Sequence, residues 1–130
     1  MHKVYGNKGN PNPIPETYDQ DTELVINRNG NTDPIAWGKW TSRGFILKRG
    51  SLVLFGGNDE VYIKEIKEEL ISDGLLIFNK DDNDYELTSD IFLWSPSTAG
   101  RIVQGHNSNG YIDWKNLSGE QLQELLYPSK

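Results

Sequence analysis

Few side chains in this sequence could carry out catalysis. It contains no cysteine and two histidines, and because His2 lies in a segment rich in proline and asparagine, a serine–histidine pair could use only His106. Ser108 lies two residues away, yet neither a GxSxG elbow nor a phosphate-binding GxxxxGK sequence is present. A catalytic base needs a positioned nucleophile and an orienting group. We therefore interpret His106 as a surface or turn residue and expect no enzyme activity.

The acidic run over residues 81–84, DDND, is the best candidate for a metal site. A calcium loop would require glycine at the sixth position and glutamate at the twelfth, where this sequence has Glu86 and Phe92. We interpret the run as the solvated tip of a hairpin and expect neither a metal nor another cofactor.

Nucleic-acid binding has more support, beginning with residues 34–57. This segment carries four basic side chains and no acidic one, and two tryptophans are interleaved with them. Arg43 and Lys48 could contact phosphates, and Trp37 or Trp40 could stack on an exposed or flipped base. The alternative is that both tryptophans pack in the core while the cations are simply solvated.

A second candidate is the start of a helix predicted over residues 95–104. The Ser95 hydroxyl can cap it, and the following proline suits the first helical position. Ser97, Thr98 and free backbone N–H groups could then hold a phosphate, with Arg101 one turn later on the same side. The alternative is that the Ser-Pro start serves only as a cap.

The third candidate is the turn that follows this helix. Gly105 is placed to end the helix, Asn109-Gly110 favours a tight turn, and residues 111–114 are predicted to return as a strand. Asn107, Asn109 and Lys115 could bind phosphate or base, unless turn geometry alone requires the asparagines. We expect folding to gather one nucleic-acid surface beside the helix start, consisting of Trp37, Trp40, Arg43, Lys48, Ser97, Thr98, Arg101, Asn107, Asn109 and Lys115.

Composition limits the kind of protein that can hold such a surface. The net charge of −6 argues against unselective binding to polyanions, so a basic face must be local. Residues 58–90 alone sum to −8. No apolar run approaches the roughly 20 residues that a membrane helix needs, and the N-terminus lacks the apolar region of a signal peptide. A cytoplasmic protein without membrane partners is expected.

The periodicity of apolar residues predicts an α+β domain with a small, mainly antiparallel sheet and about three helices. Residues 1–33 are predicted to be a flexible arm or linker that includes a short strand over 23–27, and residues 34–130 a single domain. Ser118 and Gln121 fit a capping box for the last helix. The other helices are expected at 58–73 and 95–104, and the strands within 44–55, 75–78, 85–87, 91–94 and 111–114.

Five separated motifs carry a family resemblance between Gly44 and Leu126. They are GFILKRGS, EIKEELISDG, IFLWSPSTAG, GHNSNGYIDWK and SGEQLQEL. The pattern resembles bacterial domain of unknown function 4357, often found C-terminal to GIY-YIG nucleases and other restriction-linked proteins. It also resembles the restriction enzyme and adenine methylase associated (RAMA) domain. Gly100 stands where the family usually has alanine, which costs the helix up to about 1 kcal/mol and indicates a close backbone contact.

The resemblance implies a non-catalytic accessory domain that engages DNA, including modified DNA, for a restriction-modification or nuclease system. The alternative is a protein-interaction module that docks a nuclease or methyltransferase through the apolar surface of its sheet. The acidic segment over residues 58–90 fits a basic protein partner better than it fits DNA.

Overall fold

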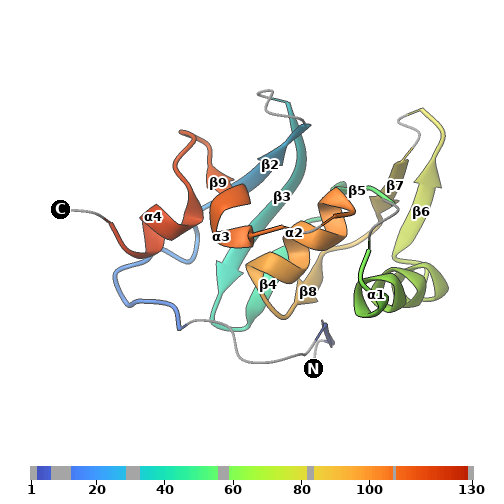
Figure 1. Cartoon of the computed structure of the whole chain (residues 1–130), viewed down its shortest axis with the longest axis horizontal. Coiled ribbons are helices and arrows are strands. Elements are labelled where there is room, and N and C mark those ends of the chain that lie inside the picture. The colour runs from blue at the N-terminus through green and yellow to red at the C-terminus, as the bar shows by residue number, and fades with distance from the viewer. Residues whose placement is uncertain are drawn as a thin grey trace.

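Two β-sheets and four helices form the described part of the chain (Figure 1). The computed structural model describes residues 3–6, 13–28, 33–55, 59–81, 84–106 and 108–128. The α+β prediction is confirmed, although the strands divide between a six-stranded and a three-stranded sheet. None of the helices in these residues is both long enough and apolar enough to span a bilayer.

The larger sheet is antiparallel except at one edge, where β1 pairs with β8 in parallel. From that edge its strands are β1 (Val4–Tyr5), β8 (Ile91–Leu93), β4 (Gly44–Leu47), β3 (Pro34–Thr41), β2 (Leu24–Asn27) and β9 (Lys115–Asn116). The smaller sheet is antiparallel, in the order β5 (Leu52–Val53), β7 (Asp84–Leu87) and β6 (Leu76–Asn79). Helix α1 (Val61–Ser72) lies beside the smaller sheet (Figure 1).

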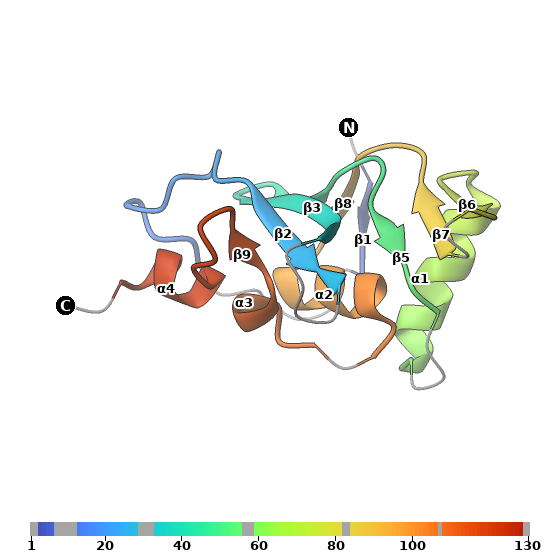
Figure 2. The ribbon, with the colours of Figure 1, turned by 90° about the horizontal axis from the view of Figure 1, so that it is seen from above.

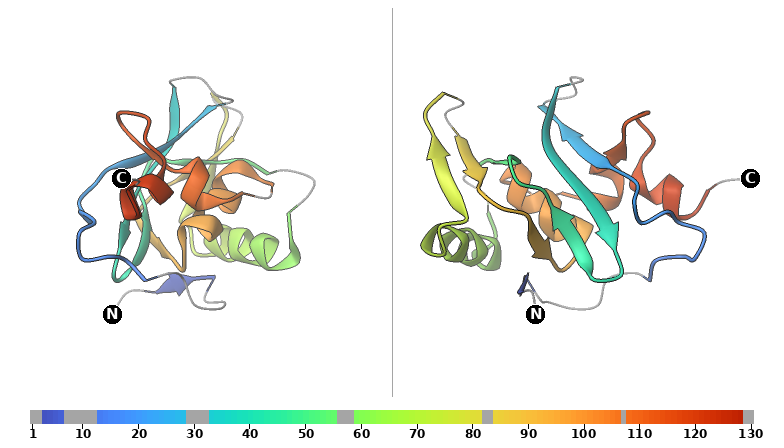
Figure 3. Two further views of the ribbon diagram at one scale, coloured as in Figure 1. Left: turned by 60° about the vertical axis from the view of Figure 1, so that its left-hand side comes forward. Right: turned by 180° about the vertical axis from the view of Figure 1, so that it is seen from behind.

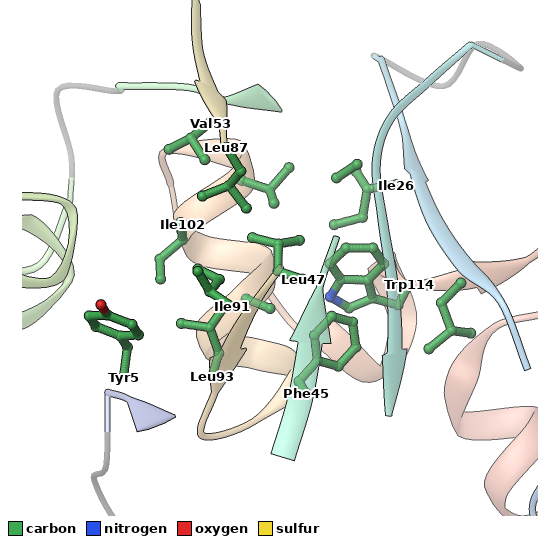
Figure 4. Packing of buried hydrophobic residues seen from close by; sticks show 14 of the residues in the cluster. Tyr5, Ile26, Phe45, Leu47, Val53, Leu87, Ile91, Leu93, Ile102 and Trp114 are labelled. Atoms are coloured by element: carbon green, nitrogen blue, oxygen red, sulfur yellow. The ribbon is translucent and has the colours of Figure 1, made fainter. Parts of the chain in front are cut away.

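One face of the larger sheet is covered by α2 (Pro96–Gln104), and α3 (Gly110–Asp113) lies on the same side, as Figure 2 shows. Helix α4 (Leu122–Leu126) follows β9. The covered face forms the core, where the rings of Phe45 and Trp114 lie with their centroids 4.6 Å apart (Figure 4). Seen from behind, β3 and β4 stand in front of α2, and no helix of the described residues covers this side (Figure 3, right).

Helix α2 forms as its sequence predicts. The Ser95 hydroxyl accepts a hydrogen bond from the Thr98 N–H, Pro96 occupies the first turn, and Gly105 ends the helix in the left-handed region at φ 71°. Gly100 is indeed a close contact, because a Cβ atom there would overlap the Ser108 hydroxyl.

The strand predicted at residues 111–114 is wrong, because residues 110–113 form helix α3. The Asn109 side chain accepts from the Tyr111 N–H and caps this helix, so Asn109-Gly110 is no hairpin turn. The Gly110 N–H donates to the Ser97 hydroxyl, and the Trp114 indole N–H donates to the Pro96 carbonyl. These long-range contacts override the local preference for a turn, and strand pairing begins only at β9.

The last helix also starts differently from its prediction. Gln121 precedes α4 without a side-chain cap, and the Asn116 side chain accepts from the backbone N–H groups of Ser118 and Glu120. The predicted capping box is therefore wrong, although Leu122 and Leu126 are buried as the apolar stripe predicts.

Residues before position 33 take part in the packed core. Tyr5, Tyr18, Leu24 and Ile26 are buried in the same cluster as Phe45. The core therefore includes residues on both sides of the change in composition near residue 33. The dipeptide Asn29-Gly30, which favours a turn, lies outside the described residues, as does Asn58, whose side chain is of a type that caps helices.

Lys67 of α1 is a fully buried cation. Its ammonium donates to Asp59 Oδ2 at 2.7 Å and to the Leu54 carbonyl at 2.8 Å, and it lies 4.6 Å from the centre of the Phe55 ring. Burial lowers the pKa of Lys67, while the hydrogen bond that its ammonium donates to Asp59 opposes that shift. The pair joins α1 to the chain that leaves β5.

Gly110→Ala should destabilise the protein by at least about 2 kcal/mol in chemical denaturation, because the new Cβ would overlap the carbonyl group of Pro96. Gly74→Ala is the control, since Gly74 has φ 74° but open space around it, so only conformational strain of about 1 kcal/mol is expected. Equal losses in the two variants would mean that the α2–α3 contact is looser than described.

Asp59→Asn should cost about 3 kcal/mol of unfolding free energy, because it leaves the buried Lys67 ammonium without its counter-charge. Adding Lys67→Met to that variant should restore most of the loss, since the uncompensated charge is then gone. A double variant no more stable than Asp59→Asn would contradict this account.

Candidate nucleic-acid interface

The uncovered face of the six-stranded sheet carries Lys48 and Lys115, two of the basic side chains considered above, together with Lys39. Side chains alternate along a strand, so the neighbours of the buried Phe45, Leu47 and Leu93 point away from the core. We call the resulting surface the open sheet face, and it consists of Trp37, Lys39, Ile46, Lys48, Phe92 and Lys115.

Lys115, Trp37 and Lys48 lie in one row across the strands. Lys115 is the register partner of Val25, Val25 is the partner of Trp37, and the Lys48 N–H donates to the Trp37 carbonyl at 2.9 Å. At roughly 4.8 Å per strand, the two lysines start about 14 Å apart. Cations with that spacing can reach different phosphates of one nucleic acid.

A second row adds another lysine. Lys39 pairs with Ile46, which pairs with Phe92, so these three side chains share the open sheet face. The strand residues of this face include no carboxylate. Asp90 lies at one corner, where its carboxylate is 3.9 Å from the Lys48 ammonium and accepts from the Arg49 N–H.

The two tryptophans of β3 lie on opposite faces. Trp37 is half-buried on the open sheet face, whereas Trp40 points into the core, is 2% exposed and packs against Phe45. Trp40 also lines a pocket of about 340 Å³ at the β3–β4 turn. Arg43 is exposed on that turn and lines the same pocket.

The pocket combines aromatic and polar walls. Its lining residues are Pro13, Ile14, Gln20, Trp40, Thr41, Ser42, Arg43, Gly44 and Trp94. The indole N–H groups of Trp40 and Trp94 are shielded from solvent and have no hydrogen-bond partner among the described residues. The pocket therefore offers aromatic surface and the Arg43 guanidinium, and it could hold a flat group that also carries negative charge.

The start of α2 is already occupied by the protein itself. The Ser97 hydroxyl accepts from Gly110, and Thr98 is buried with its hydroxyl 3.1 Å from that of Ser95. Asn109 caps α3, and Asn107 lies outside the described residues. The start of α2, which was expected to bind a phosphate, is thus the place where α2 and α3 are in contact.

Arg101 is separated from the other cations. It lies on α2, on the covered side of the sheet, where its guanidinium is 3.0 Å from the Glu60 carboxylate and donates to the Tyr62 hydroxyl. The structure therefore brings Lys115, but not Arg101, onto one face with Lys48.

Reasoning from the sequence counted Lys39 among the basic side chains of residues 34–57 without selecting it, and it missed Trp94. Alternation along residues 34–41 places Lys39 with Trp37 on the face opposite Trp40. Trp94 had no such signal, since only the packing of β8 beside β4 brings it to the β3–β4 turn. Among the described residues, no three His, Asp or Glu side chains are grouped to hold a metal ion.

The fold and this surface define a small α+β module with one face of its larger sheet uncovered and basic. Its most distinctive sequence, SPSTAG with SNG, forms the contact between α2 and α3. The chain belongs to the family described as domain of unknown function DUF4357, whose model matches residues 26–126. No curated protein and no solved structure matches it.

Proposed function

We propose that this protein is a non-catalytic accessory domain of the cytoplasm that engages DNA through its open sheet face. The observation that carries the proposal is the row of Lys115, Trp37 and Lys48, with Lys39 beside it, on a face whose strands bear no carboxylate. Lysines release counterions from phosphates, and a half-buried indole can stack on an exposed base.

The acidic remainder of the molecule is compatible with this proposal. Apart from Asp90, the described carboxylates of residues 58–90 lie in or next to α1 and the three-stranded sheet, which stand to one side of β2, β3 and β9 (Figure 1). Their repulsion would turn a polyanion toward the open sheet face, which favours one orientation over unselective binding. Lys48, Lys115 and Arg43 are therefore our candidates for phosphate contacts.

Base recognition is assigned to the pocket at the β3–β4 turn. Trp40 and Trp94 supply aromatic walls, and Arg43 can hold the phosphate of a nucleotide withdrawn from its duplex. A modified base is the proposed target. The restriction-modification or nuclease context is supported by the resemblance of the sequence motifs alone.

A second candidate function is docking of a protein partner such as a nuclease or methyltransferase. Exposed apolar side chains in and next to the three-stranded sheet favour it, since Phe55, Ile77 and Phe78 are each about half exposed. This surface is distinct from the open sheet face, so the two functions are compatible.

Replacing both Lys48 and Lys115 by alanine should lower the affinity for a DNA duplex and reduce the slope of log K against log salt by about 1.8, since each phosphate contact contributes about 0.9. Fluorescence anisotropy over a salt series measures both quantities. Lys64→Ala, an exposed cation on α1, is the matched control and should change neither. Loss of binding in Arg101→Ala instead would place the interface on the α2 side.

The protein should bind a duplex with methylated bases more tightly than the same unmethylated duplex, and Trp94→Ala should remove that difference by deleting one wall of the pocket. Binding to the unmethylated duplex should persist in the variant, whose folding is checked by thermal denaturation. Equal affinities of the unaltered protein for both duplexes would refute base recognition and leave the lysine contacts standing.

A further inference from the structure

Strand β6 lies at the free edge of the three-stranded sheet, at the periphery of the molecule in Figures 1 and 3. Its register with β7 is unbroken from Leu76 to Asn79, and no strand of the described residues pairs with its other side. A strand in this position presents backbone N–H and C=O groups that can pair with an added strand.

Natural proteins usually protect such an edge with a charge, a proline or a bulge, and the four residues of β6, LIFN, contain none of these. Leu76 anchors the strand in the core, while Ile77 is 53% exposed and Phe78 is 50% exposed. Successive side chains point to opposite faces, so an apolar group flanks the free edge on each side.

The Phe78 side extends into a row of aromatic rings. The Phe78 ring meets Tyr85 edge-on at 5.4 Å between centroids, and Tyr85 lies 4.5 Å from the ring of Phe55. The Phe55 ring in turn makes a cation–π contact with the buried Lys67 ammonium, which lies 4.6 Å from the ring centre. Because these rings already pack against one another, their side chains lose little conformational entropy when a ligand binds to them.

Charge indicates what can lie on this surface. Residues 74–90 sum to −4, with Asp81, Asp84 and Glu86 on the hairpin formed by β6 and β7, against the single cation Lys80. A second copy of the chain paired through β6 would bring two such hairpins together, and their repulsion opposes it. A basic segment would instead gain attraction.

We propose that β6 is a docking edge for an extended segment of a partner protein in which lysine or arginine alternates with apolar residues. The segment adds as a fourth strand next to β6 and forms backbone hydrogen bonds with it. Its apolar side chains pack against Phe78, whose ring is supported by Tyr85 and Phe55, and its cations face the carboxylates of the β6–β7 hairpin. This site is independent of the proposed DNA surface.

The test uses a short synthetic peptide in which lysine alternates with valine, titrated against the whole chain by calorimetry. Two control peptides have glutamate in place of lysine, or methyl groups on alternate backbone nitrogens that block strand pairing. The lysine peptide should bind at least about tenfold tighter than either control. Equal binding of the glutamate or the N-methylated peptide would overturn the proposal.

Variants of the protein locate the site. Phe78→Thr keeps a residue suited to strands but removes the ring, and it should weaken binding of the lysine peptide at least about tenfold. Leu117→Thr, at an exposed leucine after β9, is the matched control and should have no effect. Unchanged binding in Phe78→Thr, or a dimer of the protein that Phe78→Thr dissociates, would overturn it. A DNA duplex should not displace the peptide, which separates this result from the DNA proposal.

Discussion

The close approach of α3 to the first turn of α2 is the contact on which the rest of the structure depends. Gly110 lies so near the Pro96 carbonyl group that no side chain fits between them, and its N–H donates to the Ser97 hydroxyl. The same Pro96 carbonyl accepts from the indole of the fully buried Trp114. Lys115 follows Trp114 directly, so this contact also fixes the position at which β9 pairs with β2. It therefore fixes the position of one lysine of the open sheet face.

A partly buried network of polar side chains stabilises this contact. The Ser108 hydroxyl donates to the Asp113 carboxylate at 2.6 Å, and the Gln104 amide donates to both groups. Gly100 leaves the space that Ser108 fills, because a Cβ atom at position 100 would overlap the Ser108 hydroxyl. Ser97, Thr98 and Asn109, which the sequence offers as phosphate or base ligands, instead form hydrogen bonds within the protein, to Gly110, Ser95 and Tyr111 respectively.

The sequence predictions were correct where the residues that determine an element lie within that element, and wrong where distant residues determine it. Helix α2 is specified by Ser95, Pro96 and Gly105 within its own length, and its boundaries were predicted correctly. Asn109-Gly110 carries an equally strong local signal, yet contacts with residues 13 or more positions earlier turn it into a helix start. The basic surface was predictable only in part. The cations of residues 34–57 come together because β3 and β4 are adjacent, whereas the separation of Arg101 from them depends on which face of the sheet α2 covers.

The division of the strands into two sheets explains how an acidic chain can present a basic face. Residues 34–47 and 58–90 carry opposite charge and fold largely into different sheets, so the segregation visible along the sequence survives in space. Arg28 and Asp84 make one direct link between the two, at 3.7 Å. With this separation of charge, the larger sheet can attract a polyanion and the smaller sheet a polycation. Neither ligand then has to contact a surface that carries its own charge. Screening by salt should weaken both attractions, because the charges concerned are exposed or half-buried on the described surface.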